Sequence, residues 1–90
     1  MSFAVAWTQK AAEDIDEAWI LAPINHREDI IEAIGEIESS LRNSPTMAGE
    51  SREESLVRVF TVPPVTVRYR VEFQRQLVRV FAARVYRRNQ

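Results

Sequence analysis

The chain has 90 residues, 46% of them hydrophobic, a length that suits one small domain with a modest core. It has no cysteine, which excludes disulfides and thiolate metal sites, and no apolar run approaches the ~18 residues that cross a bilayer. The N-terminal segment turns acidic too early for a secretory signal, so we expect a single cytoplasmic domain over residues 1–90.

The small net charge of −1 hides a separation of charge along the chain. Residues 1–50 hold three basic and ten acidic side chains, whereas residues 51–90 hold nine basic and three acidic ones. All nine of these cations are arginines, which favours bidentate contacts with carboxylate or phosphate groups. The pattern indicates either an anionic partner for the second half or mutual neutralisation of the two halves within one molecule.

The first half predicts one strand and two helices. Residues 3–7 alternate as a short strand, and Thr8 is a suitable N-cap for a helix that Pro23 ends. Asn25 with Glu28 three residues later predicts a capping box at the start of a second helix. The apolar stripe of that helix is formed by Ile30, Ile34, Ile37 and Leu41. Because the link between the helices is very short, we expect an antiparallel helical hairpin.

The second half changes from helical spacing to strict alternation. Residues 56–62, 65–73 and 77–86 predict three strands, and Pro63-Pro64 and a short polar segment join them. Short connections make consecutive strands antiparallel. The predicted fold class is therefore α+β, in the order β-α-α-β-β-β, with the helical hairpin packed on one face of a mainly antiparallel sheet.

The uncovered face of that sheet carries the arginines. Arg68 and Arg70 point there from the middle strand, and we expect Arg58 to join them from the preceding strand. Arg79 and Arg84 have opposite parity in the last strand, so that a regular strand sends them to opposite faces. Either a bulge intervenes or one of the two lies at an edge. The alternative is that the arginines form only a solvated surface.

Three stretches resemble the RelE/ParE superfamily of toxins from type II toxin–antitoxin pairs, of the plasmid stabilisation type. They are AWTQKAAEDIDEAW, GESREESLVRVFTVPPVTVRYRV and LVRVFAARVYRR, and the resemblance as a whole covers nearly the entire chain. The positions that match the superfamily pattern are Trp7, Ala11, Asp14, Ile15, Gly49, Arg52, Pro64, Val67, Tyr69 and Val71.

The resemblance implies a growth-inhibiting toxin that a cognate antitoxin neutralises. RelE-like members cleave mRNA on the ribosome, and ParE-like members bind DNA gyrase. The resemblance to RelE would assign a catalytic set of Arg84, Tyr86 and Arg87. However, the strand position that carries an arginine in RelE-like members is Val65 here, and the paired lysines before that strand are absent. The chain is therefore nearer to the ParE-like members. A non-toxic interaction module with the same fold is a further alternative.

For a toxin of this kind, the candidate binding residues are Arg52, Arg58, Arg68, Arg70 and Arg79. They would hold phosphates of a nucleic acid or an acidic antitoxin segment. The sequence pI of about 5.8 argues against RNA, because nucleic-acid-binding domains are generally basic overall. We expect no metal and no cofactor.

Other conspicuous side chains have structural explanations. We expect Trp7 and Trp19 to anchor the core between helices and sheet, and Tyr69 to pack on the apolar face of its strand. His26 is expected to be an ordinary residue in the first turn of a helix, since the sequence places no second metal ligand or nucleophile near it.

Overall fold

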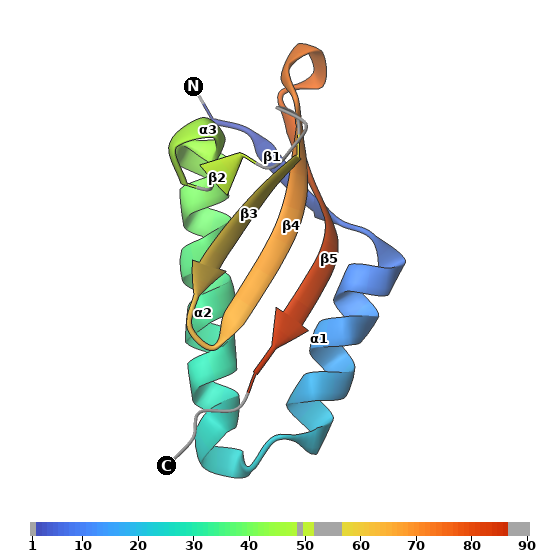
Figure 1. The fold of residues 1–90 in the computed structure, drawn as a ribbon, viewed down its shortest axis with the longest axis vertical. Helices are drawn as coiled ribbons and strands as arrows, with labels where there is room; N and C mark the ends of the chain where they lie inside the picture. The colour runs from blue at the N-terminus through green and yellow to red at the C-terminus, as the bar shows by residue number, and fades with distance from the viewer. Residues whose placement is uncertain (1, 49, 52–56, 87–90) are drawn as a thin grey trace.

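The computed structural model describes residues 2–48, 50–51 and 57–86, and it has the predicted α+β order with two short additional elements (Figure 1). The elements are β1 (Ala4–Trp7), α1 (Gln9–Leu21), α2 (Ile24–Asn43), α3 (Pro45–Ala48), β2 (Glu50–Ser51), β3 (Val57–Val62), β4 (Val65–Glu72), the 3-10 turn η1 (Phe73–Arg75) and β5 (Leu77–Val85). The sequence did not predict α3 or β2.

The strands form one mixed sheet in the order β1-β5-β4-β3-β2. β3, β4 and β5 are antiparallel neighbours, which confirms the predicted meander, and β1 pairs in parallel with β5. Val62 lies directly opposite Val65, so that Pro63 and Pro64 alone connect β3 to β4. In Figure 1, α1 runs beside β5 and α2 lies behind β3 and β4, and the two helices join at the lower end.

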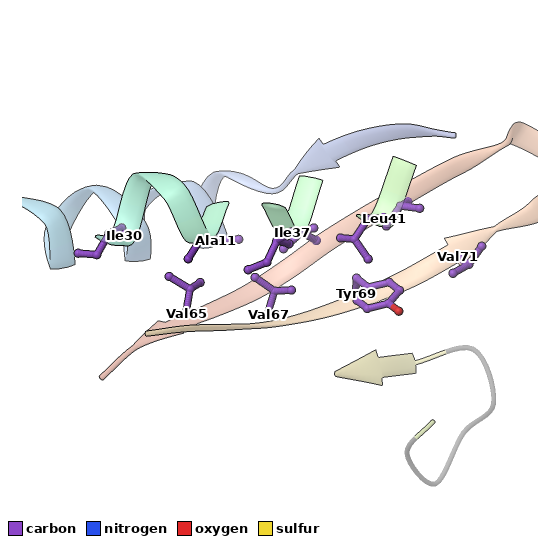
Figure 2. Packing of buried hydrophobic residues seen from close by; sticks show 11 residues of the cluster. Ala11, Ile30, Ile37, Leu41, Val65, Val67, Tyr69 and Val71 are labelled. Atoms are coloured by element: carbon purple, nitrogen blue, oxygen red, sulfur yellow. The ribbon is translucent and has the colours of Figure 1, made fainter. Parts of the chain in front are cut away.

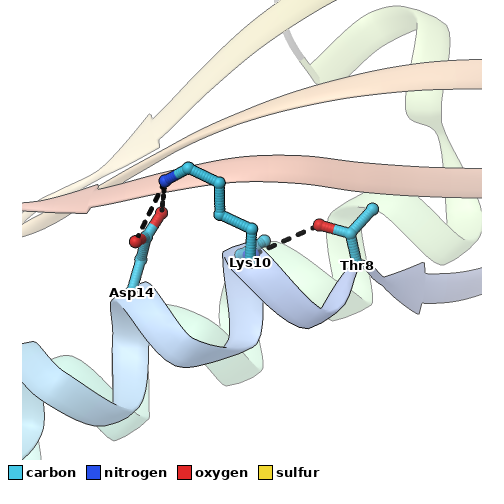
Figure 3. A network of polar contacts seen from close by, with 4 residues as sticks. Thr8, Lys10 and Asp14 are labelled. Atoms are coloured by element: carbon cyan, nitrogen blue, oxygen red, sulfur yellow. Dashed lines mark hydrogen bonds and ion pairs between the residues drawn. The ribbon is translucent and has the colours of Figure 1, made fainter.

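The predicted cap of α1 is confirmed. The Thr8 hydroxyl accepts a hydrogen bond from the backbone amide of Ala11 at 3.2 Å, which satisfies one of the free amides of the first turn (Figure 3). Lys10 and Asp14, which are one helical turn apart, form an ion pair in which Nζ of Lys10 is 3.2 Å from Oδ2 of Asp14. This ion pair is exposed and contributes little to stability.

The predicted capping box of α2 is wrong. The helix begins at Ile24 with Pro23 as its N-cap, and no side chain caps it. Pro23 lacks an amide hydrogen and its φ is −58°, so it can precede the first turn without losing a hydrogen bond. Asn25 is therefore already inside the helix, where its side chain cannot serve as the cap.

The core lies between α2 and the middle of the sheet (Figure 2). Ile37 and Leu41 point from the helix toward Val67 and Tyr69 on β4. The buried apolar residues are Ala11, Ile30, Ala33, Ile37, Leu41, Val65, Val67, Tyr69, Val71, Val78 and Val80. Each large aliphatic side chain in this set contributes about 1.5–3 kcal/mol through burial.

The two tryptophans differ from each other, and only Trp7 agrees with the prediction. Trp7 packs against the core, and its indole nitrogen donates to the carboxylate of Glu38 at 2.8 Å. Trp19 is 36% exposed, so its prediction as a core anchor is wrong. Trp19 follows Ile15 by one helical turn, but its ring lines a depression between α1 and α2 and lies under the guanidinium of Arg27 instead of entering the core.

Tyr69 is fully buried, as predicted, and it also has a polar role. Its hydroxyl donates to the backbone carbonyl of Pro45 at 2.6 Å, which ties the start of α3 to the middle of β4. Within the described part of the chain, no helix is both long and apolar enough to span a membrane.

Candidate functional site

The open face is the side of β3, β4 and β5 that the helices leave uncovered. Along β4 the side chains of Val65, Val67 and Tyr69 are buried. Arg68 and Arg70, the residues on either side of Tyr69, are exposed. This alternation confirms the prediction that two arginines of the middle strand share the uncovered face.

Arg58 does not share that face. The register of β3 and β4 places Arg58 opposite Tyr69, and residues directly opposite in a sheet point to the same side. Arg58 is therefore on the side that carries the helices, together with Phe60, which packs against the core. The expectation that it joins Arg68 was wrong, because Arg58 has the parity of the buried side chains of its own strand.

A bulge brings Arg79 and Arg84 to the same face. Arg79 lies opposite Arg70, and Arg84 lies opposite Thr66, both of which are open-face positions of β4. Between these pairs the register shifts, because Phe81 is an extra residue in β5. Of the two alternatives left by the sequence, the bulge is the one that the structure contains.

Arg79 is already neutralised in part. Its Nε atom is 3.1 Å from Oε2 of Glu72, and the same carboxylate lies 3.7 Å from Nη1 of Arg75. All three side chains are partly exposed, so the contacts are weak in energy, but they place one carboxylate between two guanidinium groups. Arg79 therefore has less capacity for an external anion than its position alone suggests.

Arg68 and Arg84 are the cations available for an external anion. Across the described residues, neither has a carboxylate partner. They border a depression of about 370 Å³ that is lined by Val59, Thr66, Arg68, Ala82, Ala83 and Arg84. Ala82 lies opposite Arg68, and its small side chain leaves room above the sheet.

Arg70 has a different environment. Its guanidinium carbon is 5.6 Å from the centre of the Phe81 ring, so the bulge residue supplies an aromatic surface to a neighbouring cation. Such a contact contributes about 0.5–1 kcal/mol at an exposed position. Among the described residues, the open face thus combines two guanidiniums without an ion pair, one stacked guanidinium and one guanidinium held by Glu72.

Three hydroxyl groups form a chain beside Arg84. The hydroxyl oxygens of Thr61 and Thr66 are 2.8 Å apart, and the Thr66 oxygen is 3.1 Å from the Tyr86 hydroxyl. The backbone amide of Tyr86 donates to the carbonyl of Pro64 at 3.1 Å, which holds the end of β5 near the turn before β4. The phenol of Tyr86 is thus held against Thr66, whose cross-strand neighbour is Arg84, and it remains 42% exposed.

A second depression begins on the other side of Arg84 and Tyr86. It has a volume of about 510 Å³ and lies between the end of β5 and α1. Its polar lining includes Lys10, Glu17 and His26. His26 lies in the first turn of α2, as expected, although the fold brings it toward the end of β5.

Some sequence candidates cannot be placed. Arg52, Arg87 and Gly49 lie outside the described residues. In the ranges 2–48, 50–51 and 57–86, no group of three or more histidine or acidic side chains could hold a metal ion.

Sequence reasoning missed Phe81, Thr66 and the pairing of Glu72 with Arg79. The opposite parity of Arg79 and Arg84 was the available signal for the first, because it required a bulge between them. The contacts of Thr66 and Glu72 cross between strands, so they depend on a register that the sequence does not specify by itself.

A protein-family model matches most of the chain. The model of a family described as the ParE toxin of the type II toxin–antitoxin system parDE matches residues 5–90. Among curated proteins, none matches the chain significantly.

Solved structures show the same fold at low sequence identity. A chain of the chromosomal ParDE system from P. aeruginosa has a TM-score of 0.72 and 22% identity, and the match covers 94% of this chain and 97% of that one. A chain of the RelBE2 toxin–antitoxin complex from Mycobacterium tuberculosis has a TM-score of 0.72 and 16% identity, with coverage of 96% and 93%. A chain of the intact E. coli RelBE complex has a TM-score of 0.62 and 16% identity, with coverage of 96% and 99%.

Proposed function

Because the chain belongs to the ParE toxin family of type II toxin–antitoxin systems, we propose that it inhibits bacterial growth by binding a protein target such as DNA gyrase. The open face of the sheet is the target-binding surface, and a cognate antitoxin neutralises the toxin by covering it. The observation that carries this proposal is the pair of guanidinium groups, Arg68 and Arg84, that border one depression without a carboxylate partner in the described part of the chain.

The chemistry of this pair favours carboxylate groups on a protein. A guanidinium presents two parallel N–H donors to a carboxylate, and two guanidiniums at one depression can hold two acidic side chains or one well-placed pair of oxygens. The net charge of −1 and the acidic first half weaken long-range attraction to a polyanion such as RNA. A protein with acidic side chains at its binding surface is therefore the favoured target class.

The antitoxin is inferred from the family and from the solved structures of similar fold. The RelBE2 and RelBE structures are toxin–antitoxin complexes. In this chain, an antitoxin that places acidic residues at Arg68 and Arg84 would compete directly with the target for the same cations.

Regulated expression in bacteria tests the proposal. We expect expression of the chain to arrest growth, and the double variant Arg68→Ala/Arg84→Ala to lose the arrest. Loss of one charge-assisted hydrogen bond weakens binding by about 10-fold or more, and the double variant removes at least two. Arg75→Ala is the matched control. Arg75 is a strongly exposed arginine of η1, between β4 and β5, and it lies outside the depression. Equal loss of arrest in the control would contradict the assignment.

The target is identified separately. Purified protein is added to a DNA gyrase supercoiling reaction, where we expect inhibition by the native chain and by Arg75→Ala, and none by the double variant. Growth arrest without inhibition of gyrase would support the function as a toxin but exclude gyrase as its target.

A ribosome-dependent ribonuclease is the second candidate, and the hydroxyl chain of Thr61, Thr66 and Tyr86 favours it. The Tyr86 phenol contacts Thr66, which lies opposite Arg84, so Thr66 links a proton donor for a leaving oxygen to a residue that can bind a phosphate. Mapping message ends after incubation with translating ribosomes tests this function. New ends that disappear in Tyr86→Phe would support it, whereas an unchanged message would reject it.

A further inference from the structure

The tip of the helical hairpin exposes a group of large apolar side chains on the helices. Five residues form this hairpin patch, namely Trp19, Ile20, Leu21, Ile24 and Ile31. Ile20, Leu21 and Ile24 are 64%, 67% and 80% exposed, although isoleucine and leucine are among the residues most often buried. Apolar side chains gathered on one surface of a small protein mark an interaction site.

The hairpin patch contains a groove. A depression of about 450 Å³ lies between α1 and α2 and is lined by Ile15, Asp16, Trp19, Ile20, Ile31 and Ile34. A second depression of about 560 Å³ lies on the other side of Ile20, where Glu13, Asp16, Glu17 and Leu21 complete its lining. Ile20 is therefore an apolar ridge between two hollows, a shape into which the side chains of a partner helix can interlock.

The border of the hairpin patch is acidic. Residues 9–43, which span both helices, contain nine acidic side chains and three basic ones. Lys10 is joined to Asp14, and across the described residues Asp16 and Glu17 have no cationic partner. In the described part of the chain, the carboxylates at the groove thus have no ion-pair partner.

The cation that lies nearest to the hairpin patch is already engaged. The guanidinium of Arg27 stacks over the ring of Trp19 at 4.4 Å and donates to the backbone carbonyls of Trp19, Ile20 and Ala22 at 3.0–3.2 Å. Arg27 therefore holds the end of α1, and among the described residues it forms no ion pair with a carboxylate of the border. Two copies of such a surface would repel each other, which argues against a second copy of this chain as the occupant.

We propose that the hairpin patch docks a basic amphipathic helix of a partner protein. Apolar side chains of that helix, spaced three or four residues apart, occupy the hollows on both sides of Ile20, and its lysines or arginines face Asp16 and Glu17. The inference goes beyond the proposed function, because the hairpin patch belongs to the helical layer and the arginine pair lies on the uncovered face of the sheet. Its occupant has the opposite charge to a ligand of the arginine pair.

Synthetic peptides test the proposal on the full chain. The probe is a helical peptide of about 18 residues, or five turns, with a leucine stripe flanked by lysines. The control peptide has the same sequence with glutamates in place of the lysines. Fluorescence anisotropy of the labelled peptides measures binding. We expect the lysine peptide to bind at least ~10-fold more tightly than the glutamate peptide, and added salt to weaken its binding, because charge complementarity provides the difference.

Two variants locate the binding surface. Ile20→Ser/Leu21→Ser is expected to weaken binding of the lysine peptide by ~10-fold or more, since both side chains are exposed and their loss removes apolar contact area. Phe73→Ser is the control, because Phe73 is 55% exposed but lies at the η1 end of the sheet, away from the hairpin tip. Circular dichroism verifies that each variant is folded. Equal losses in the two variants, or none in either, would overturn the proposal.

A charge reversal and a mass measurement complete the test. Asp16→Lys/Glu17→Lys is expected to reverse the preference, so that the glutamate peptide binds more tightly than the lysine peptide. Sedimentation of the native chain is expected to give a monomer. A dimer that Ile20→Ser abolishes would assign the hairpin patch to a second copy and overturn the proposal. The variant Arg68→Ala/Arg84→Ala should bind the lysine peptide as tightly as the native chain does. The peptide test can therefore reject this proposal without rejecting the proposed function, and the growth test can do the reverse.

Discussion

Arg79 and Arg84 project from β5 onto the same face of the sheet, although their positions in the sequence have opposite parity. The extra residue Phe81 between them causes this arrangement, and it also supplies the ring on which Arg70 stacks. One bulge therefore determines both how many cations share the open face and how one of them is held.

Deletion of Phe81 should strongly destabilise the protein. Without the bulge, the side chains in one part of β5 must point to the opposite face of the sheet. The residues that leave the helix side are then either Val78 and Val80 or Ala83 and Val85. In the first case, exposure of two buried valines costs about 3 kcal/mol, which for a domain of this size lowers the melting temperature by more than ~10 °C. In the second case the loss is smaller, because Ala83 and Val85 are only partly buried. Thermal unfolding followed by circular dichroism measures the change.

The control for this deletion is Phe81→Ala, which keeps the chain length. It removes the ring contact with Arg70, worth about 0.5–1 kcal/mol, and should leave the register unchanged. If the deletion were no more destabilising than the alanine variant, the role assigned to the bulge would be wrong.

Replacement of Glu72 by glutamine should release Arg79 with little loss of stability. The Glu72 contacts with Arg79 and Arg75 are partly exposed, and such pairs contribute about 0–1 kcal/mol. The open face should therefore become more basic, and the variant should elute from a heparin column at higher salt than the native chain. Glu36→Gln makes the same change in net charge on α2, and its elution should shift less.

Tyr69→Phe should destabilise the protein without changing its fold. The variant removes the donor to the Pro45 carbonyl and leaves a buried acceptor without this hydrogen bond, at a cost of about 1–3 kcal/mol. Urea unfolding measures the difference. Tyr86→Phe provides the comparison, because its hydroxyl is at an exposed position, and we expect a change below about 0.5 kcal/mol.

Arg27→Ala should loosen the tip of the helical hairpin. Arg27 satisfies carbonyls at the C-terminal end of α1 and stacks on Trp19, and we expect its removal to cost about 1–2 kcal/mol in urea unfolding. Arg27→Lys keeps the charge but lacks the planar fork, so it should recover less than half of the loss. Full recovery by lysine would show that charge alone, rather than the fork, holds the hairpin.

Periodicity in the sequence determined the elements and most of the core. The alternation in residues 65–72 placed Val67 and Tyr69 inside and Arg68 outside, and helical spacing placed Ile37 and Leu41 against them. These predictions succeeded because the direction of a side chain follows from the local geometry of a strand or a helix.

Tertiary structure decided which charged and aromatic side chains are available. Arg58 lies on the helix side, Trp19 is partly exposed, and Glu72 pairs with Arg79 while leaving Arg68 and Arg84 unpaired among the described residues. Each outcome depends on strand register, on a bulge or on how α1 packs against β5. Such features come from contacts between residues far apart in the chain, so local periodicity cannot specify them.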